Sequence, residues 1–171
     1  MDSHSGEGLV LVLLIRHAQA AEQSDLEYPD DTLRPLVPKG KKTQARLSKE
    51  LRRRKLIPDR VFSSPWKRAW QTARILVEET GLPKSARVAC EALAAVPDLA
   101  RIAEEVGDVA ADATIALVGH EPWMSELAAL LLTGRAEALH VDFPKSGVMG
   151  IELEELSADG GNGTLRFFLV P

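Results

Sequence analysis

The chain has 171 residues and a formal net charge of −4, and 45% of its residues are hydrophobic while 27% are charged. A chain of this length fits one domain and can bury a sizeable core, and its composition is typical of a globular protein. The acidic balance gives no support to nucleic-acid binding, so we expect no nucleic-acid partner.

The N-terminal region predicts neither a membrane span nor a signal peptide. Residues 1–8 are polar and are predicted to be a flexible segment ahead of a single domain over residues 9–171. The apolar run that follows them is too short to span a membrane, and no basic region precedes it. The lone Cys90 excludes an internal disulfide and a cysteine-based zinc site. We therefore expect a cytoplasmic protein without a membrane partner.

The first predicted element is a strand over residues 9–15. Its β-branched and leucine-rich run is typical of a strand that is buried on both faces. Arg16 and His17 follow directly, and ligands of open α/β sheets bind at the carboxyl ends of such strands. The polar loop over residues 18–38 is long for a connection, and long loops in compact domains are often functional. Residues 39–55 have the spacing of a helix.

Strands and helices alternate from there to the end of the chain. Ser64 is the predicted N-cap, and Pro65 the first residue, of a helix that ends at Gly81. A turn at residues 160–163 is expected to join the last two strands. The remaining predicted elements are strands over residues 60–62, 87–89, 114–118, 148–153 and 165–170, a helix over residues 99–106, and a helix that follows Pro122 and reaches about residue 132.

This alternation predicts an α/β fold with a mostly parallel sheet and helices on both faces. Because the carboxyl ends of parallel strands meet at one edge, we expect the polar groups after three of the strands to come together. These groups are Arg16 and His17, then Ser63, Ser64 and Arg68, and finally His120. The helices that start near Pro65 and Pro122 would present free backbone N–H groups at the same edge, where they favour an anion.

Two arginines, two histidines and two helix N-termini suit a phosphoryl group. Arginine binds pairs of oxygen atoms, and donors aimed at the equatorial oxygens stabilise the transition state of phosphoryl transfer. A neutral imidazole among cations, which lower its pKa, can attack phosphorus as a nucleophile. We therefore predict a phosphohistidine intermediate on His17 that water then hydrolyses. Four histidines without metal-ligand spacing argue against a metal site, and the chemistry needs no cofactor.

Several segments resemble the signatures of a known family. They are Arg16-His17-Ala18, Arg34-Pro35-Leu36 with Lys39-Gly40, and residues 63–73, 118–122 and 163–171. Together they resemble the histidine phosphatase superfamily, which includes the cofactor-dependent phosphoglycerate mutases, and more narrowly its small bacterial phosphohistidine phosphatases of the SixA type. The resemblance covers nearly the whole chain, and it implies a phosphoglycerate mutase-like three-layer α/β/α sandwich.

The resemblance also implies roles for individual residues. His17 would accept the phosphoryl group, and His120 would donate a hydrogen bond to it. Arg16 and Arg68 would clamp the phosphoryl oxygens. Arg34 would line the pocket and bind substrate. No metal and no cofactor are implied.

The general acid is the least defined part of this expected site. Many members of the superfamily carry a Glu or Asp after the third strand, where this chain offers only Glu91 and Asp98, and we take Glu91 as the candidate. An imidazole leaving group has a pKa of about 6.5 and can carry its own proton. Cleavage of a P–N bond therefore needs less acid catalysis than cleavage of an alcohol phosphate, which favours a phosphohistidine substrate.

These observations support three hypotheses about function. The first is a phosphohistidine phosphatase that acts on a phosphorylated signalling protein, whose surface could reach a pocket without large insertions. The alternatives are a small-molecule phosphomonoesterase, with the loop over residues 18–38 as a lid, and a non-catalytic phosphate-binding regulatory domain. Relative rates on a phosphohistidine protein and on small phosphate esters separate the first two hypotheses. Phosphate binding without turnover would identify the third. A mutase, which needs a competent acid–base group, is the least expected function.

Overall fold

The computed structural model describes residues 8–171, so residues 1–7 of the predicted N-terminal segment lie outside the described part. Its centre is a six-stranded sheet with the order β3-β2-β4-β1-β5-β6. The strands are β1 (Val10–Arg16), β2 (Arg60–Ser63), β3 (Arg87–Ala89), β4 (Thr114–Gly119), β5 (Val148–Leu153) and β6 (Thr164–Leu169). The α-helices are α1 (Pro38–Arg53), α2 (Lys67–Thr80), α3 (Leu99–Val106) and α4 (Trp123–Thr133), and the short 3-10 helices are η1 (Asp31–Leu33), η2 (Lys84–Ala86) and η3 (Glu91–Ala94).

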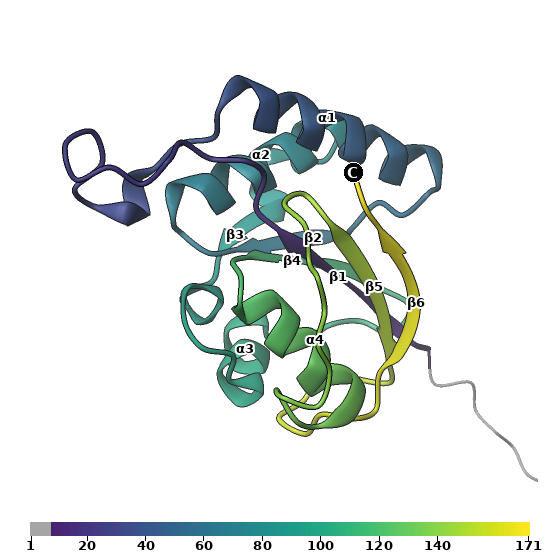
Figure 1. Cartoon of the computed structure of the whole chain (residues 1–171). Coiled ribbons are helices and arrows are strands. Elements are labelled where there is room, and N and C mark those ends of the chain that lie inside the picture. Colours follow the sequence, from purple (N-terminus) through teal and green to yellow (C-terminus); the bar gives the residue numbers. More distant parts are fainter. Residues whose placement is uncertain (1–7) are drawn as a thin grey trace, which may run out of the picture.

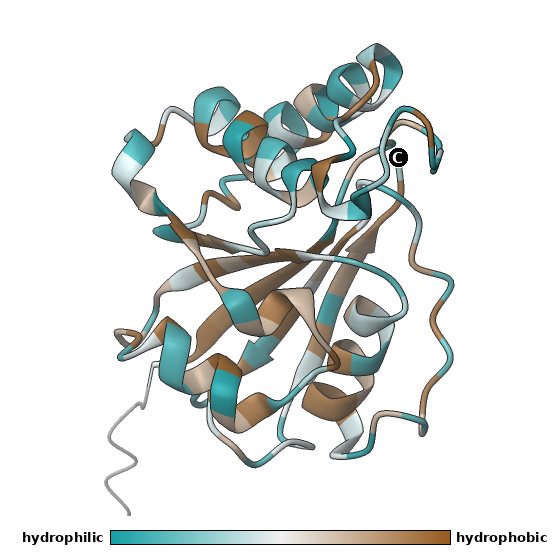
Figure 2. Ribbon diagram, turned by 90° about the vertical axis from the view of Figure 1, so that its left-hand side faces the viewer, coloured by the Kyte–Doolittle hydropathy of each residue, from teal (hydrophilic) through white to brown (hydrophobic). Residues whose placement is uncertain are grey.

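Helices cover both faces of this sheet. α1 and α2 lie on one face and α3 and α4 on the other (Figure 1), and Figure 2 shows the sheet between the two helical layers. β1, β2, β3 and β4 run parallel, whereas β5 is antiparallel to β1 and β6 is antiparallel to β5. The predicted α/β/α sandwich with a mostly parallel sheet is confirmed. None of the helices in the described part is long and apolar enough to cross a membrane.

The side chains of β1 alternate between the two halves of the core. Val12 and Leu14 belong to the cluster that includes α3 and α4, whereas Leu13 and Ile15 belong to the cluster that includes α1 and α2. All four side chains are fully buried, and the burial of each contributes about 1.5–3 kcal/mol. This two-sided burial explains the unbroken apolar run in the sequence. It also fixes the end of β1, where the candidate nucleophile follows.

The start of α2 differs from the prediction. The helix begins directly after Trp66, which occupies the N-cap position and makes no side-chain capping bond, so Pro65 precedes the helix. Ser64 does not cap it. Instead, the Ser64 N–H donates to the Val118 carbonyl at 3.0 Å, which continues the sheet pairing, and the Ser64 hydroxyl accepts from the Trp66 N–H at 3.2 Å. The predicted end of the helix is confirmed, because Gly81 is its C-cap with a φ of 79°.

The glycine-rich residues 160–163 do not form the predicted hairpin turn. Residues 154–163 together join β5 to β6, and the Gly163 N–H donates to the Leu131 carbonyl in α4 at 2.9 Å. A Cβ on Gly163 would lie only 2.8 Å from that carbonyl oxygen. The glycines are therefore explained by close approach of this connection to a helix, which local turn signals do not reveal.

We expect the substitution Gly40→Ala to destabilise the fold. Gly40 lies in the first turn of α1, and a Cβ there would lie 2.1 Å from the Gln19 carbonyl oxygen, so the helix or the loop after His17 has to move. Overpacking of this kind typically costs about 1–3 kcal/mol. Urea denaturation should show a loss of that size in the free energy of unfolding, whereas Lys41→Ala, at an exposed position of the same helix, should change it by less than about 0.5 kcal/mol. An unchanged free energy of unfolding for Gly40→Ala would contradict this close approach.

Candidate active site

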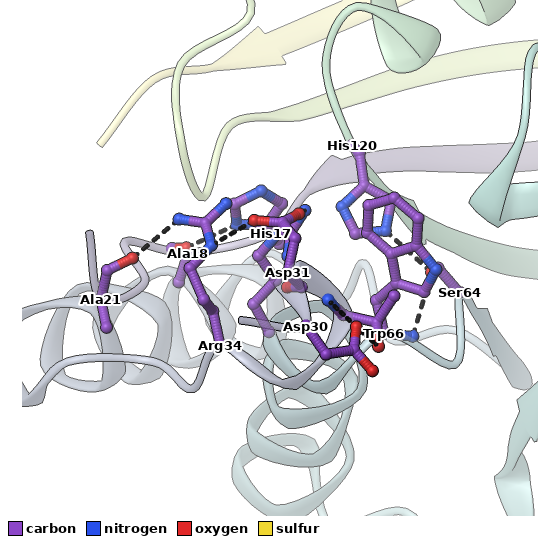
Figure 3. Close-up of polar contacts among 11 residues, drawn as sticks. His17, Ala18, Ala21, Asp30, Asp31, Arg34, Ser64, Trp66 and His120 are labelled. Carbon is purple, nitrogen blue, oxygen red and sulfur yellow. Dashed lines mark hydrogen bonds and ion pairs between the residues drawn. The ribbon is translucent and has the colours of Figure 1, made fainter. Parts of the chain in front are cut away.

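The carboxyl ends of β1, β2 and β4 bring the predicted residues together. The His17 N–H donates to the Gly119 carbonyl at 2.9 Å, so the residue after β1 lies beside the end of β4. The imidazole centroids of His17 and His120 are 5.2 Å apart, and Figure 3 shows His120 beside Ser64 and His17 on the side of Asp31. Both histidines are more than nine-tenths buried. The edge of the sheet therefore holds two buried imidazoles side by side.

One hydrogen bond fixes the tautomer of His17. Its Nδ1 lies 2.7 Å from the Ala18 carbonyl oxygen, and because a carbonyl only accepts, Nδ1 must carry the proton. The lone pair of the neutral ring is then on Nε2. The Ala18 N–H donates to the Thr72 hydroxyl at 3.0 Å, and that hydroxyl donates to the Arg68 carbonyl at 2.7 Å, so the segment is fixed to α2. His17 is thus held with Nε2 available as a nucleophile.

Burial keeps His17 neutral. Desolvation is the largest cause that lowers the pKa of His17 to about 3, and the positive charges of Arg68, Arg16 and Lys145 lower it further, against an opposing effect of the bond to Ala18. The sequence predicted a lowered pKa but assigned it to surrounding positive charge, which is the smaller cause. At neutral pH the imidazole has the unprotonated nitrogen that an attack on phosphorus requires.

His120 is oriented by the hydroxyl of Ser64. The His120 Nε2 lies 2.8 Å from the Ser64 Oγ, which also accepts from the Trp66 N–H. With the hydroxyl proton directed to Nε2, the neutral ring carries its own proton on Nδ1, and this nitrogen is buried without a partner among residues 8–171. Trp66 and Trp123 pack against the ring, with centroids 4.5 and 5.9 Å away. Burial first, then the charges of His17 and Arg68, lowers the pKa of His120 to about 3.

Each of the two candidate clamp arginines is held at a terminal nitrogen, while another nitrogen is buried without a partner in the described part of the chain. The Nη1 of Arg16 donates to the Phe143 carbonyl at 2.7 Å, and that of Arg68 donates to the Asp31 carbonyl at 2.8 Å. The Nε atoms of both arginines have no hydrogen-bond partner within the described part of the chain. Together with Nδ1 of His120, they are three buried donors in one region, and a buried donor left unpaired costs about 1–3 kcal/mol. Such donors are suited to the binding of an oxyanion.

Arg34 reaches this site through Asp31, a residue that the sequence analysis did not single out. The Arg34 Nε donates to one Asp31 carboxylate oxygen at 2.6 Å, and Arg68 Nη2 donates to the other at 3.0 Å. Arg34 also donates from Nη1 to the Ala21 carbonyl at 2.7 Å. Among the described residues, no hydrogen bond joins Arg34 to either histidine. The signal that could have found Asp31 is its place in the long loop, three residues before Arg34.

Glu91 and Cys90 lie where β3 ends. Glu91 is the exposed first residue of η3, and no hydrogen bond or ion pair between residues 8 and 171 links it to His17 or His120. Cys90 is fully buried, and burial together with the neighbouring Glu105 raises the pKa of its thiol to about 12. In the described part of the chain, no group of three or more His, Cys, Asp and Glu side chains could hold a metal ion.

Comparison with known proteins agrees with the family resemblance of the sequence motifs. Residues 12–94 match the model of the histidine phosphatase superfamily (branch 1). The chain is 35% identical over 169 residues to an uncharacterized protein of Mycobacterium tuberculosis, covering 92% of this chain and 99% of that protein. It is 28% identical over 162 residues to phosphohistidine phosphatase SixA of Escherichia coli, covering 94% and 93%. A crystal structure of SixA from Agrobacterium tumefaciens shares the fold, with a TM-score of 0.73 at 23% identity over 94% and 97% of the two chains.

We expect the buried neutral histidines to make stability fall on acidification. In the unfolded chain, His17 and His120 each bind a proton near pH 6.5, whereas in the folded chain both stay neutral down to about pH 3. The unfolded state therefore binds more protons between these values, and the free energy of unfolding decreases as the pH falls through this window. Each histidine contributes about 1.4 kcal/mol per pH unit at most.

Urea denaturation between pH 7 and pH 5 measures this slope. His120→Gln should make it shallower than in the parent chain, whereas His140→Gln, at an exposed position, should leave it unchanged. An equal slope in the parent chain and in His120→Gln would show that His120 is not held neutral by the fold.

Proposed function

The chain belongs to the histidine phosphatase superfamily (branch 1), and its family match together with its similarity to phosphatases makes it a phosphatase; we propose that it hydrolyses protein phosphohistidine through a covalent intermediate on His17. The observation that carries this proposal is the fixed, neutral imidazole of His17, with Nε2 unprotonated near buried donors that lack partners among residues 8–171. A nucleophile and a site for the anion are the two requirements of phosphoryl transfer to a side chain.

The proposed reaction has two steps. In the first, Nε2 of His17 attacks phosphorus, the P–N bond of the substrate breaks, and the substrate imidazole leaves with the proton on its other nitrogen. In the second, water attacks the phosphohistidine, which releases inorganic phosphate and neutral His17, while the proton of water goes to phosphate or solvent. Arg16, Arg68 and His120 donate to the phosphoryl oxygens, on which charge develops in both transition states.

The choice of a phosphohistidine substrate is supported by the chemistry of the leaving group. The first step replaces one imidazole on phosphorus with another, so it does not require a strong general acid. This agrees with a site in which, among the described residues, no carboxyl group forms a hydrogen bond or ion pair with His17. The similarity to Escherichia coli SixA supports the same substrate class. We further propose that the substrate is a phosphorylated signalling protein and that the reaction takes place in the cytoplasm, without a metal, cofactor, nucleic acid or membrane.

The first test traps the intermediate. After brief exposure to phosphoramidate and an alkaline quench, intact-mass spectrometry should show one phosphoryl group on the protein, located on His17. His17→Ala should form no adduct, and its kcat should fall by about 10³-fold or more, as is usual when a nucleophile is removed. The exposed His140→Ala is the matched control and should behave like the parent chain.

The outcomes separate the hypotheses. Much faster hydrolysis of a phosphohistidine protein than of small phosphate esters supports the proposal. The reverse order of rates identifies a small-molecule phosphomonoesterase. Phosphate binding with neither an adduct nor turnover would leave a regulatory domain.

We expect Glu91→Gln to have little effect on phosphohistidine hydrolysis. Glu91 is our candidate general acid, yet it is exposed and the imidazole leaving group carries its own proton. The rate on a phosphohistidine protein should change by less than about threefold, while any acid role should appear as a larger loss on an alkyl phosphate ester. A loss of about 10²-fold on both substrates would instead make Glu91 an obligatory acid.

A further inference from the structure

Asp31 connects two arginines of the site, and the proposed reaction assigns it no role. Its backbone carbonyl accepts from Arg68 Nη1 at 2.8 Å, and one carboxylate oxygen accepts from Arg68 Nη2 at 3.0 Å. The other carboxylate oxygen accepts from Arg34 Nε at 2.6 Å. Figure 3 shows Asp31 and Arg34 next to His17, on the loop between β1 and α1. Both terminal nitrogens of Arg68 are therefore held by a single residue.

The two clamp arginines are anchored in parallel ways. Arg16 is held at Nη1 by the Phe143 carbonyl, and Arg68 is held at Nη1 by the Asp31 carbonyl. In both, Nε is buried and has no partner in the described residues. A guanidinium can bind an oxyanion through Nε and the neighbouring Nη2, as a side-on pair of donors. Because each Nη carries two N–H groups, this anchoring leaves Nε of Arg68 and the second N–H of its Nη2 for an oxyanion.

Asp31 is itself held from the opposite side. Arg34 donates to its carboxylate and, from Nη1, to the Ala21 carbonyl at 2.7 Å, so it braces Asp31 against the loop. Partial burial alone would raise the pKa of Asp31, but the hydrogen bonds and charges of Arg34 and Arg68 outweigh it and hold the pKa below its usual value. The carboxylate, about a third exposed, thus stays charged and fixed between two guanidinium groups.

We infer that Asp31 is a positioning residue that, braced by Arg34, turns the Nε side of Arg68 toward the phosphoryl group. This inference rests on the proposed function in that a phosphoryl group is the anion that Arg68 receives. Arg34 then acts on the reaction through Asp31 and Arg68, without touching the substrate.

The direction in which phosphate affinity changes when Asp31 is removed distinguishes positioning of Arg68 from a purely electrostatic effect of the Asp31 charge. Removal of Asp31 adds one positive charge to a site for a doubly charged anion, which by itself would tighten phosphate binding. Loss of Arg68 orientation has the opposite effect, because misplaced donors no longer reach the oxygens. A weaker affinity in spite of the added positive charge therefore indicates positioning.

The experiment is calorimetric titration of the full chain with inorganic phosphate. We expect Asp31→Ala to weaken phosphate binding about tenfold, and Asp31→Asn, which keeps an acceptor oxygen for Arg68, to recover part of that loss. Asp30→Asn is the matched control, because Asp30 carries the same charge one residue earlier, while its carboxylate accepts from Thr32 and, among the described residues, from no arginine. This control should bind phosphate like the parent chain.

A double-mutant cycle with Arg68→Ala completes the test. If Asp31 acts through Arg68, Asp31→Ala should have no further effect on phosphate affinity in the Arg68→Ala background. The same loss in both backgrounds would overturn the inference in favour of a general structural role, and tighter binding by Asp31→Ala would make Asp31 a competitor of phosphate. If Asp31→Ala alone unfolds, the cycle is run with Asp31→Asn. These titrations need no turnover, so they stand or fail independently of phosphohistidine hydrolysis.

Discussion

The parallel pairing of β4 with both β1 and β2 is the constraint on which the whole site depends. It sets Arg16 opposite Gly119 and Ser63 opposite Val118, so the residues that follow each strand emerge side by side. The backbone bond from His17 to Gly119 extends this register beyond β1. Because successive side chains of a strand point to opposite faces, a slip of one residue would separate the two histidines. The chemistry is thus a direct consequence of sheet register.

Burial then gives the converging residues their properties. Two imidazoles that would titrate near neutrality in water stay uncharged. The Ala18 carbonyl selects the tautomer of His17, and the Ser64 hydroxyl forms a hydrogen bond with Nε2 of His120. The arginines stay charged, and each has one end fixed to the backbone. The result is a site whose donors are arranged before any anion arrives, which is the arrangement that stabilises transition-state charge most effectively.

Much of this could be predicted from the sequence because it depends on local pattern. A two-sided apolar run predicts a buried parallel strand, and the polar residues directly after it must lie at the edge of the sheet, which is why His17, His120 and Arg68 could be named. The contacts of Asp31 and Trp66 could not be predicted, since both residues lie in segments whose path is set by distant partners. The same reason explains the errors at Ser64 and in the glycine-rich residues 160–163. At these positions, residues that are typical of helix caps and turns instead contact the backbone of β4 and α4.

The burial of Cys90 determines how the chain responds to oxidants and alkylating agents. Oxidants and alkylating agents attack the thiolate, and a fully buried thiol with a pKa of about 12 offers almost none at neutral pH. The proposed nucleophile is the imidazole of His17, and the chain has no other cysteine. Phosphatases that attack through a cysteine can be switched off by peroxide, whereas the proposed attack by His17 uses no thiolate. We therefore expect oxidation of thiols to leave this attack intact.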